Sequence, residues 1–247
     1  MIAEPAVQLR LLDLQALDSR LDQIEHRRRS LPQLATIAGL ETRLADLRDR
    51  IVAGETEPHD LERGLAKAET DVEQVRARAA KDQELLDSGR VSSARELENL
   101  QHEIASLARR QGDLEEAELE VMERLEDARA ALAVLTTERD GLRAQLEVAV
   151  AERDEAWSAA DRDRDWVAGE RTSVLADIPA DLMALYTKLR ADHDGVGAAR
   201  LHQRRCDGCR MELTPTDIGR IRGAAPDEVL RCEECRRILV RTPESGL

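Results

Sequence analysis

The segment Cys206–Cys235 reads CDGCRMELTPTDIGRIRGAAPDEVLRCEEC and holds all four cysteines of the chain. They form two knuckles, CDGC and CEEC, separated by 22 residues. Zn²⁺ takes four tetrahedral thiolates, and a two-residue spacer lets both sulfurs of one knuckle reach the same ion. The pattern predicts a C-terminal zinc ribbon in which a lengthened middle hairpin absorbs the spacer. The predicted ligands of its single structural zinc ion are Cys206, Cys209, Cys232 and Cys235.

Two other uses of these cysteines are a pair of disulfide bonds and a thioredoxin-like redox pair. The N-terminal sequence MIAEPAVQL lacks the basic region of a secretion signal. No βαβ pattern surrounds either knuckle, as a thioredoxin-like site requires. With four thiolates already available and no fifth ligand nearby, zinc keeps no open position for water or substrate, which favours a structural role over catalysis.

The composition is that of long helices. Of the 247 residues 36% are charged, and the only aromatic residues are two Trp and one Tyr, too few for a globular core of this length. The net charge of -14 is uneven, because residues 196–247 contain 10 arginines against 8 carboxylates while the rest carry the acidic excess. We therefore expect any nucleic-acid contact at the C-terminal module. Since no apolar run of membrane-spanning length occurs, we expect a cytoplasmic protein that makes no membrane contact.

Apolar residues recur at spacings of three and four along the first 150 positions, the seam of a coiled coil. From Leu97 to Ala149 the seam is uninterrupted, with polar residues at Gln111, Glu118 and Arg139 that either specify register or mark loosely packed layers. The N-terminal half shows the same seam in pieces. Pro32 and Pro58 divide the pieces, so we expect kinks or short breaks there.

The segment 87–93 reads DSGRVSS and gives the strongest turn signal in the helical region. Ser93 and Glu96 fit a capping box that would start the second arm. Arms of similar length on either side of one turn favour folding back, with residue i opposite roughly residue 182 − i, because pairing within a chain has a high effective concentration. Pairing with a second chain is the alternative, which leaves monomer and dimer both open.

The predicted fold is therefore mainly α: a long antiparallel coiled-coil hairpin followed by a small β zinc ribbon. The predicted domains are a hairpin over residues 1–170 with its tip near 88–93, a connecting helix over 171–195, and the ribbon over 196–247. Pro179 fits the first position of the connecting helix.

Three stretches together resemble a known bacterial family. They are LLDLQALD at 11–18, SARELENLQHEI at 93–104, and the paired knuckles followed by RRIL at 236–239. In that family a long helical hairpin precedes a four-cysteine zinc ribbon, and the resemblance covers essentially the whole chain. It implies a protein without known catalytic activity; many members are uncharacterised, and some look like regulators of flagellar genes that contact RNA or a transcription factor. Arg236 stands where the family often has glycine.

No phosphate-binding loop, metalloprotease helix or catalytic triad occurs, so we expect no enzyme. The ribbon is rich in arginine, a side chain suited to binding carboxylate and phosphate groups. The sequence predicts a zinc-ribbon adaptor or regulator that binds a protein partner, with RNA or DNA as the other candidate. A passive structural rod and a redox or enzymatic protein are the alternatives. The expected contact residues are Arg204, Arg205, Arg210, Arg236 and Arg237.

Overall fold

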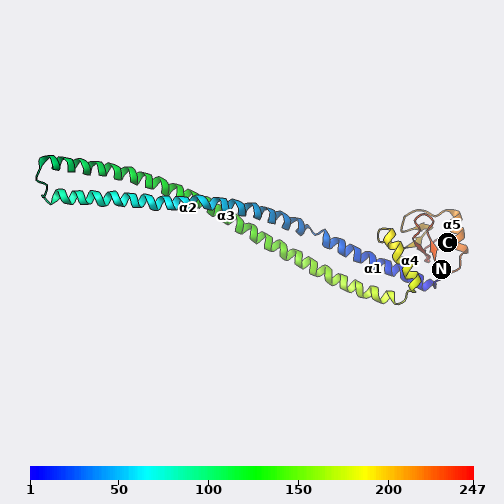
Figure 1. Cartoon of the computed structure of the whole chain (residues 1–247). Coiled ribbons are helices and arrows are strands. Elements are labelled where there is room, and N and C mark those ends of the chain that lie inside the picture. The colour runs from blue at the N-terminus through cyan, green and yellow to red at the C-terminus, as the bar shows by residue number, and fades with distance from the viewer. The chain divides into compact units, whose positions relative to one another are not determined.

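The computed structural model describes all residues, 1–247, and confirms the predicted fold class of a helical hairpin followed by a small strand region (Figure 1). The chain forms two compact units, residues 36–149 and residues 1–35 with 150–247. The elements are α1 (Pro5–Arg29), α2 (Pro32–Asp87), α3 (Ala94–Leu175), α4 (Ala180–Asp192), β1 (Ala198–His202), β2 (Arg205–Cys206), α5 (Pro215–Gly223), β3 (Leu230–Arg231) and β4 (Ile238–Val240).

In the unit of residues 36–149, α2 and α3 run antiparallel around a narrow apolar seam. Leu40, Leu47 and Ile51 are buried on α2, and Leu125 and Leu142 are buried on α3. The two helices are joined by residues 88–93, where the sequence predicts the tip, and Gly89 has a φ of +65° there. Only glycine adopts this left-handed conformation without strain, so it suits the point where the chain reverses.

The helix ends differ in part from the prediction. Pro32 is the first residue of α2 after the break at residues 30–31, as expected, whereas α2 runs through Pro58 without a break. Pro58 is buried, and packing of its ring in the seam offsets the lost backbone hydrogen bond. At the tip, the Ser93 carbonyl accepts from the Leu97 amide at 3.0 Å, the first hydrogen bond of α3, and the predicted side-chain capping box with Glu96 does not form.

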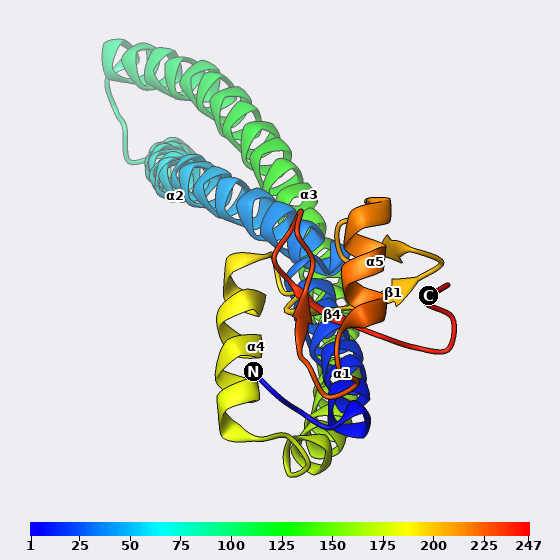
Figure 2. The same ribbon diagram turned by 90° about the vertical axis from the view of Figure 1, so that its right-hand side faces the viewer.

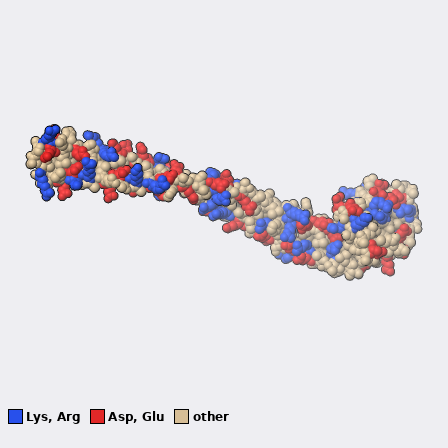
Figure 3. All heavy atoms as spheres, viewed as in Figure 1, with Lys and Arg blue, Asp and Glu red and all other residues tan.

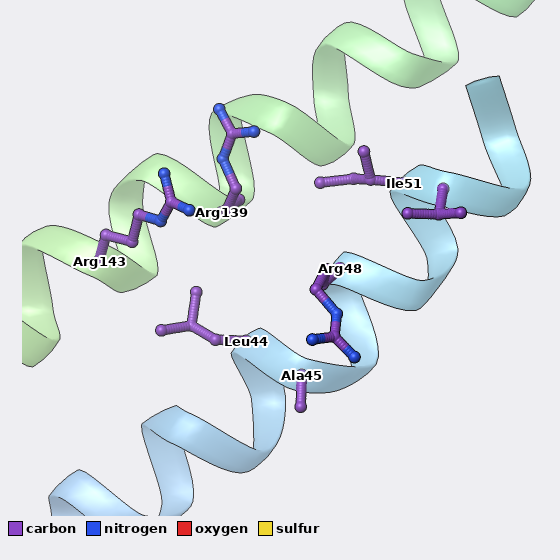
Figure 4. A pocket seen from close by; sticks show the side chains of 7 residues that line it. Leu44, Ala45, Arg48, Ile51, Arg139 and Arg143 are labelled. Atoms are coloured by element: carbon purple, nitrogen blue, oxygen red, sulfur yellow. The ribbon is translucent and has the colours of Figure 1, made fainter.

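Two polar residues of the seam, Gln111 and Arg139, make different kinds of contact. Gln111 Nε2 donates to Glu115 Oε1 at 2.8 Å, and Arg76 from the other arm donates to the same oxygen. These hydrogen bonds, that from Gln111 first, lower the pKa of Glu115, and the bond from Arg76 links the arms. Arg139 instead pairs with its neighbour Asp140 and borders a hollow of about 350 Å³ between the helices (Figure 4). Gln111 therefore supports, through Glu115, an ion pair between the arms, and Arg139 belongs to a loosely packed layer.

The register of the two arms is offset from the expected one. Cross-arm ion pairs such as Arg78–Glu103 and Arg43–Glu138 join residues whose numbers add to 181, whereas Arg76–Glu115 and Arg129–Glu62 add to 191. The pairing is therefore centred near 186 rather than 182, about one helical turn away. The sequence rule assumes a symmetric turn at 88–93, and this offset means that the turn is asymmetric.

The other unit contains a four-stranded sheet in the order β2-β1-β4-β3, in which β1 and β4 are parallel. Ile238 and Val240 point to one side and pack with α1 and α4, while Leu239 points to the other and packs with α5. Figure 2 shows β4 between α4 and α5. The spacer between the knuckles therefore holds a helix, and the longer hairpin predicted there is wrong. Thr214 caps α5 by accepting from the Asp217 amide, and Pro215 is its first residue.

A buried carboxylate joins three helices of this unit. Asp18 on α1 is 2% exposed, accepts from the Tyr186 hydroxyl at 2.7 Å and from Arg171 Nε at 2.5 Å, and lies 3.6 Å from Arg190 Nε. Burial and the hydrogen bond to Asp18 raise the pKa of Tyr186 far above its ordinary value. The phenol therefore stays protonated and acts as a donor.

Replacing Asp18 should destabilise this unit strongly. Asp18→Ala leaves the Tyr186 hydroxyl and the Arg171 guanidinium without their carboxylate, while Arg190 keeps Asp22 at 2.6 Å. Removing one partner of a buried ion pair costs about 3–5 kcal/mol. Urea unfolding followed by the fluorescence of Trp157 and Trp166, both on α3, measures the loss. Asp13→Ala is the control, since the Asp13 side chain is 56% exposed and its loss should cost less than about 1 kcal/mol. Equal effects of the two variants would contradict this role of Asp18.

Candidate metal centre

The two knuckles have the same backbone design. Cys206 ends β2 and its carbonyl accepts from the Arg210 amide at 2.7 Å; the Cys232 carbonyl accepts from the Arg236 amide at 2.9 Å. Each turn closes with an arginine at a φ of +62°, the left-handed region that favours glycine. Glycine is therefore the conformationally natural residue at both positions, and Arg236 occupies one of them at the expense of local backbone strain.

The knuckles bring the four sulfurs together. Cys206 Sγ lies 3.9 Å from Cys235 Sγ, Cys209 Sγ lies 3.8 Å from Cys232 Sγ, and all four lie within 4.8 Å of one another. Zinc–sulfur bonds of about 2.3 Å place the corners of a tetrahedron about 3.8 Å apart. Disulfide sulfurs would be about 2.05 Å apart. The sulfurs are therefore arranged for one structural Zn²⁺ and not for two disulfides.

The surroundings of the sulfurs also suit a cation. Burial raises the pKa of the Cys206 thiol well above its ordinary value and that of Cys232 to about 11, so these thiols resist ionisation on their own. Burial acts in the same sense on Cys235, but hydrogen bonds from the Arg237 amide and side chain lower its pKa overall. A dication favours the thiolates and so opposes the cost of burial.

The nearby histidine does not join this group. His202 ends β1, and its Nε2 lies 4.0 Å from a Glu244 carboxylate oxygen. With four sulfurs as ligands, the zinc ion would brace the ribbon and hold no exchangeable water.

The sequence did not reveal how α1 holds the ribbon. Gln15 Nε2 donates to the Gly195 carbonyl at 2.8 Å, and Gln15 Oε1 accepts from the Gly197 amide at 2.7 Å. Gln8 Nε2 donates to the Ala3 carbonyl at 2.8 Å and lies 3.4 Å from that of Glu228. A Cβ on Gly197 would lie 2.6 Å from the Tyr186 carbonyl oxygen, so the first strand can approach α4 only without a side chain there. In the sequence, Gln8 and Gln15 are marked only as polar residues within a segment of periodic apolar residues.

The five arginines expected to contact a partner fall into two groups. Arg204, Arg205 and Arg210 are exposed around the first knuckle, and none of them forms an ion pair. Arg236 lies 3.4 Å from Glu233, while Arg237 donates to the carbonyls of Val196 and His193 at 2.9 and 3.1 Å. The guanidinium of Arg237 thus fastens the second knuckle to the turn before β1.

Comparison with known proteins agrees with this architecture. Residues 14–194 match the model of the CT398-like coiled coil hairpin domain, and residues 205–239 match the C4-type zinc ribbon domain. The chain belongs to the CT398-like hairpin family. No helix combines the length and apolarity needed to cross a membrane.

Solved structures of proteins from three bacteria are similar to this chain. A protein from Mycobacterium smegmatis is 36% identical, with a TM-score of 0.81 over 98% of this chain and 100% of its own. CT398 from Chlamydia trachomatis is 18% identical, with a TM-score of 0.63 over 96% and 98% of the two chains. HP0958 from Helicobacter pylori is 15% identical, with a TM-score of 0.51 over 97% and 99%. The two distant structures support the fold alone.

A similar protein with a curated record is itself uncharacterised, so its name gives no activity. The uncharacterised protein Rv2229c of Mycobacterium tuberculosis is 40% identical over 88 residues, which is 36% of this chain and 36% of that protein. The match therefore spans about a third of the length of this relative.

Loss of one thiolate should release the metal. We expect the purified chain to contain one zinc ion by elemental analysis and Cys232→Ser to contain far less, because a structural site needs all four ligands and its binding energy also folds the ribbon. Glu234→Ser changes an exposed residue of the same knuckle and should retain the zinc. A zinc-free wild-type ribbon that stays folded with both cysteine pairs oxidised would overturn the assignment.

Proposed function

We propose that this protein is a non-catalytic adaptor whose ribbon binds an acidic surface of a protein partner. In this proposal residues 1–170 form a spacer hairpin, 171–195 a connecting helix and 196–247 the binding module. Cys206, Cys209, Cys232 and Cys235 hold the zinc ion that shapes this module. The first knuckle makes the contact through Arg204, Arg205 and Arg210.

The proposal rests on three arginines around the first knuckle that have no acidic partner. Asp207 of this knuckle pairs with Arg200, which also pairs with Glu244, and on the second knuckle Arg220 and Arg236 share Glu233. The guanidinium groups of Arg204, Arg205 and Arg210 form no ion pair and remain exposed. Three such groups on a rigid surface suit the carboxylates of a partner, since arginine binds them through two parallel hydrogen bonds.

The second knuckle contributes differently. Arg237 is committed to backbone carbonyls, and Arg236 is partly neutralised by Glu233. We assign Arg237 to the positioning of the ribbon and Arg236 to the edge of the contact. Of the five arginines that the sequence predicts as contact residues, the proposal therefore keeps the three of the first knuckle as the centre of the contact.

A nucleic-acid partner is the second candidate, because the same arginines suit phosphates. Against it, both Trp residues and the Tyr lie on α3 and α4 rather than on the ribbon, so the arginines have no aromatic neighbours on which bases could stack. On the face shown in Figure 3, basic and acidic atoms alternate without a broad basic region. Both features favour a protein partner.

The triple variant Arg204→Gln, Arg205→Gln, Arg210→Gln tests the contact. We expect crosslinked partners captured from lysate by the wild type, with or without nuclease, to fall about tenfold or more, because the variant removes the charged centre of the interface. Arg220→Gln removes an arginine that is already paired with Glu233 and should leave capture unchanged.

Salt separates the two partner classes. Phosphate binding would make the affinity for generic RNA or DNA fall steeply with salt and show little sequence preference. Capture that disappears with nuclease would move the proposal to nucleic acid. If neither class binds and the triple variant changes nothing, the chain is a passive rod.

A further inference from the structure

A hollow of about 520 Å³ lies beside the first knuckle, where the chain leaves β2 and enters α5. Its floor is apolar: Leu213 and Ile218 are each 6% exposed and belong to the ribbon core. Two guanidinium groups and one carboxylate stand at its edge. The lining residues are Arg204, Glu212, Leu213, Pro215, Ile218, Gly219 and Arg222.

The charges at this edge are unbalanced. Arg222 is exposed and forms neither an ion pair nor a hydrogen bond, and Arg204 donates only to the Gly246 carbonyl at 3.1 Å. Glu212 is the only acidic residue of the lining and is likewise outside any ion pair. The hollow thus combines a net positive edge with an apolar floor, which complements a ligand that is both acidic and apolar.

Gly219 keeps one side of the hollow open. It lies inside α5, where glycine costs roughly 0.5–1 kcal/mol relative to alanine. A Cβ at this position would meet nothing within 4 Å, so packing within the chain gives no reason for glycine. The same holds for Gly112 and Gly141 on α3, but only Gly219 lines this hollow, where an added side chain would narrow it. Gly223, at the end of α5, lies outside the lining.

We propose that this groove binds a short acidic segment of a protein partner. One apolar side chain of the segment packs on Leu213 and Ile218, and neighbouring carboxylates pair with Arg204 and Arg222. The inference rests on the proposed function and deepens it, because Arg204 belongs to both contacts. The groove also uses Arg222 and the apolar floor, which have no part in the charge contact proposed for the first knuckle.

Methyl NMR of the full zinc-loaded chain, labelled at Ile and Leu, reports on the floor directly. The probe is a pool of peptides of about ten residues, rich in Asp and Glu, with one Leu, Ile, Met or Phe each. Polyglutamate of equal length and a pool with Lys in place of the acids are the comparisons. We expect saturable shifts of the Ile218 and Leu213 methyl signals with the acidic-apolar pool, weaker effects with polyglutamate and none with the basic pool.

Four variants locate the site. Gly219→Gln and Arg222→Gln should each weaken binding of the pool about fivefold or more, the first by filling the groove and the second by removing a charge. Glu212→Gln should strengthen it, because the only opposing carboxylate is gone. Gly223→Gln adds the same side chain one helical turn away and should have no effect. Glutamine suits a helix better than glycine, so neither glycine variant should impair folding.

The outcomes distinguish this inference from the proposed function. If polyglutamate binds as well as the acidic-apolar pool and Gly219→Gln has no effect, the groove is wrong, while a charge contact at the first knuckle survives. If RNA oligonucleotides and not peptides shift these methyl signals, a peptide ligand is excluded. If no probe shifts them and the triple arginine variant leaves lysate capture unchanged, both fail.

Discussion

Four sulfur atoms within 4.8 Å of one another constrain the whole C-terminal module. As thiolates they repel one another, and as buried thiols they gain little by being gathered there. A single dication resolves both problems, because it stabilises the ionised sulfurs and binds all four together. The shape of the two knuckles follows from binding all four sulfurs to one ion. The backbone must reverse sharply at Arg210 and Arg236, even though both are then left in a conformation suited to glycine.

Four-sulfur coordination also bears on where the proposed contact lies. A zinc ion with four sulfur ligands has no position for water or substrate, so we expect the site to shape a surface. The reversed knuckle turn and the cap at Thr214 bring β2 and α5 together beside Arg204 and Arg222. The arginines that lack acidic partners on this surface are the groups that we propose bind a ligand.

Sequence patterns predicted those features that depend on spacing along the chain. The cysteine knuckles, the apolar seam and the turn at 88–93 each depend on residues that are close together in the sequence. Such patterns can be read without knowing the contacts between distant segments. Features that depend on contacts between distant residues were missed. Gln15 and Asp18 lie in an apolar segment of α1, but their partners, Gly197 and Tyr186, follow about 170–180 residues later. Helix α5 was missed although Thr214-Pro215 carries a start signal, because the zinc-ribbon pattern suggested a hairpin.

The ribbon as described requires one zinc ion bound by four sulfurs and by nothing else. X-ray absorption at the zinc edge of the purified full chain tests it directly, because the first shell reports both the kind and the distance of the ligands. We expect four sulfur atoms at about 2.3 Å and no nitrogen or oxygen. A first shell that mixes sulfur with nitrogen or oxygen would contradict it, because the site would then hold an exchangeable position.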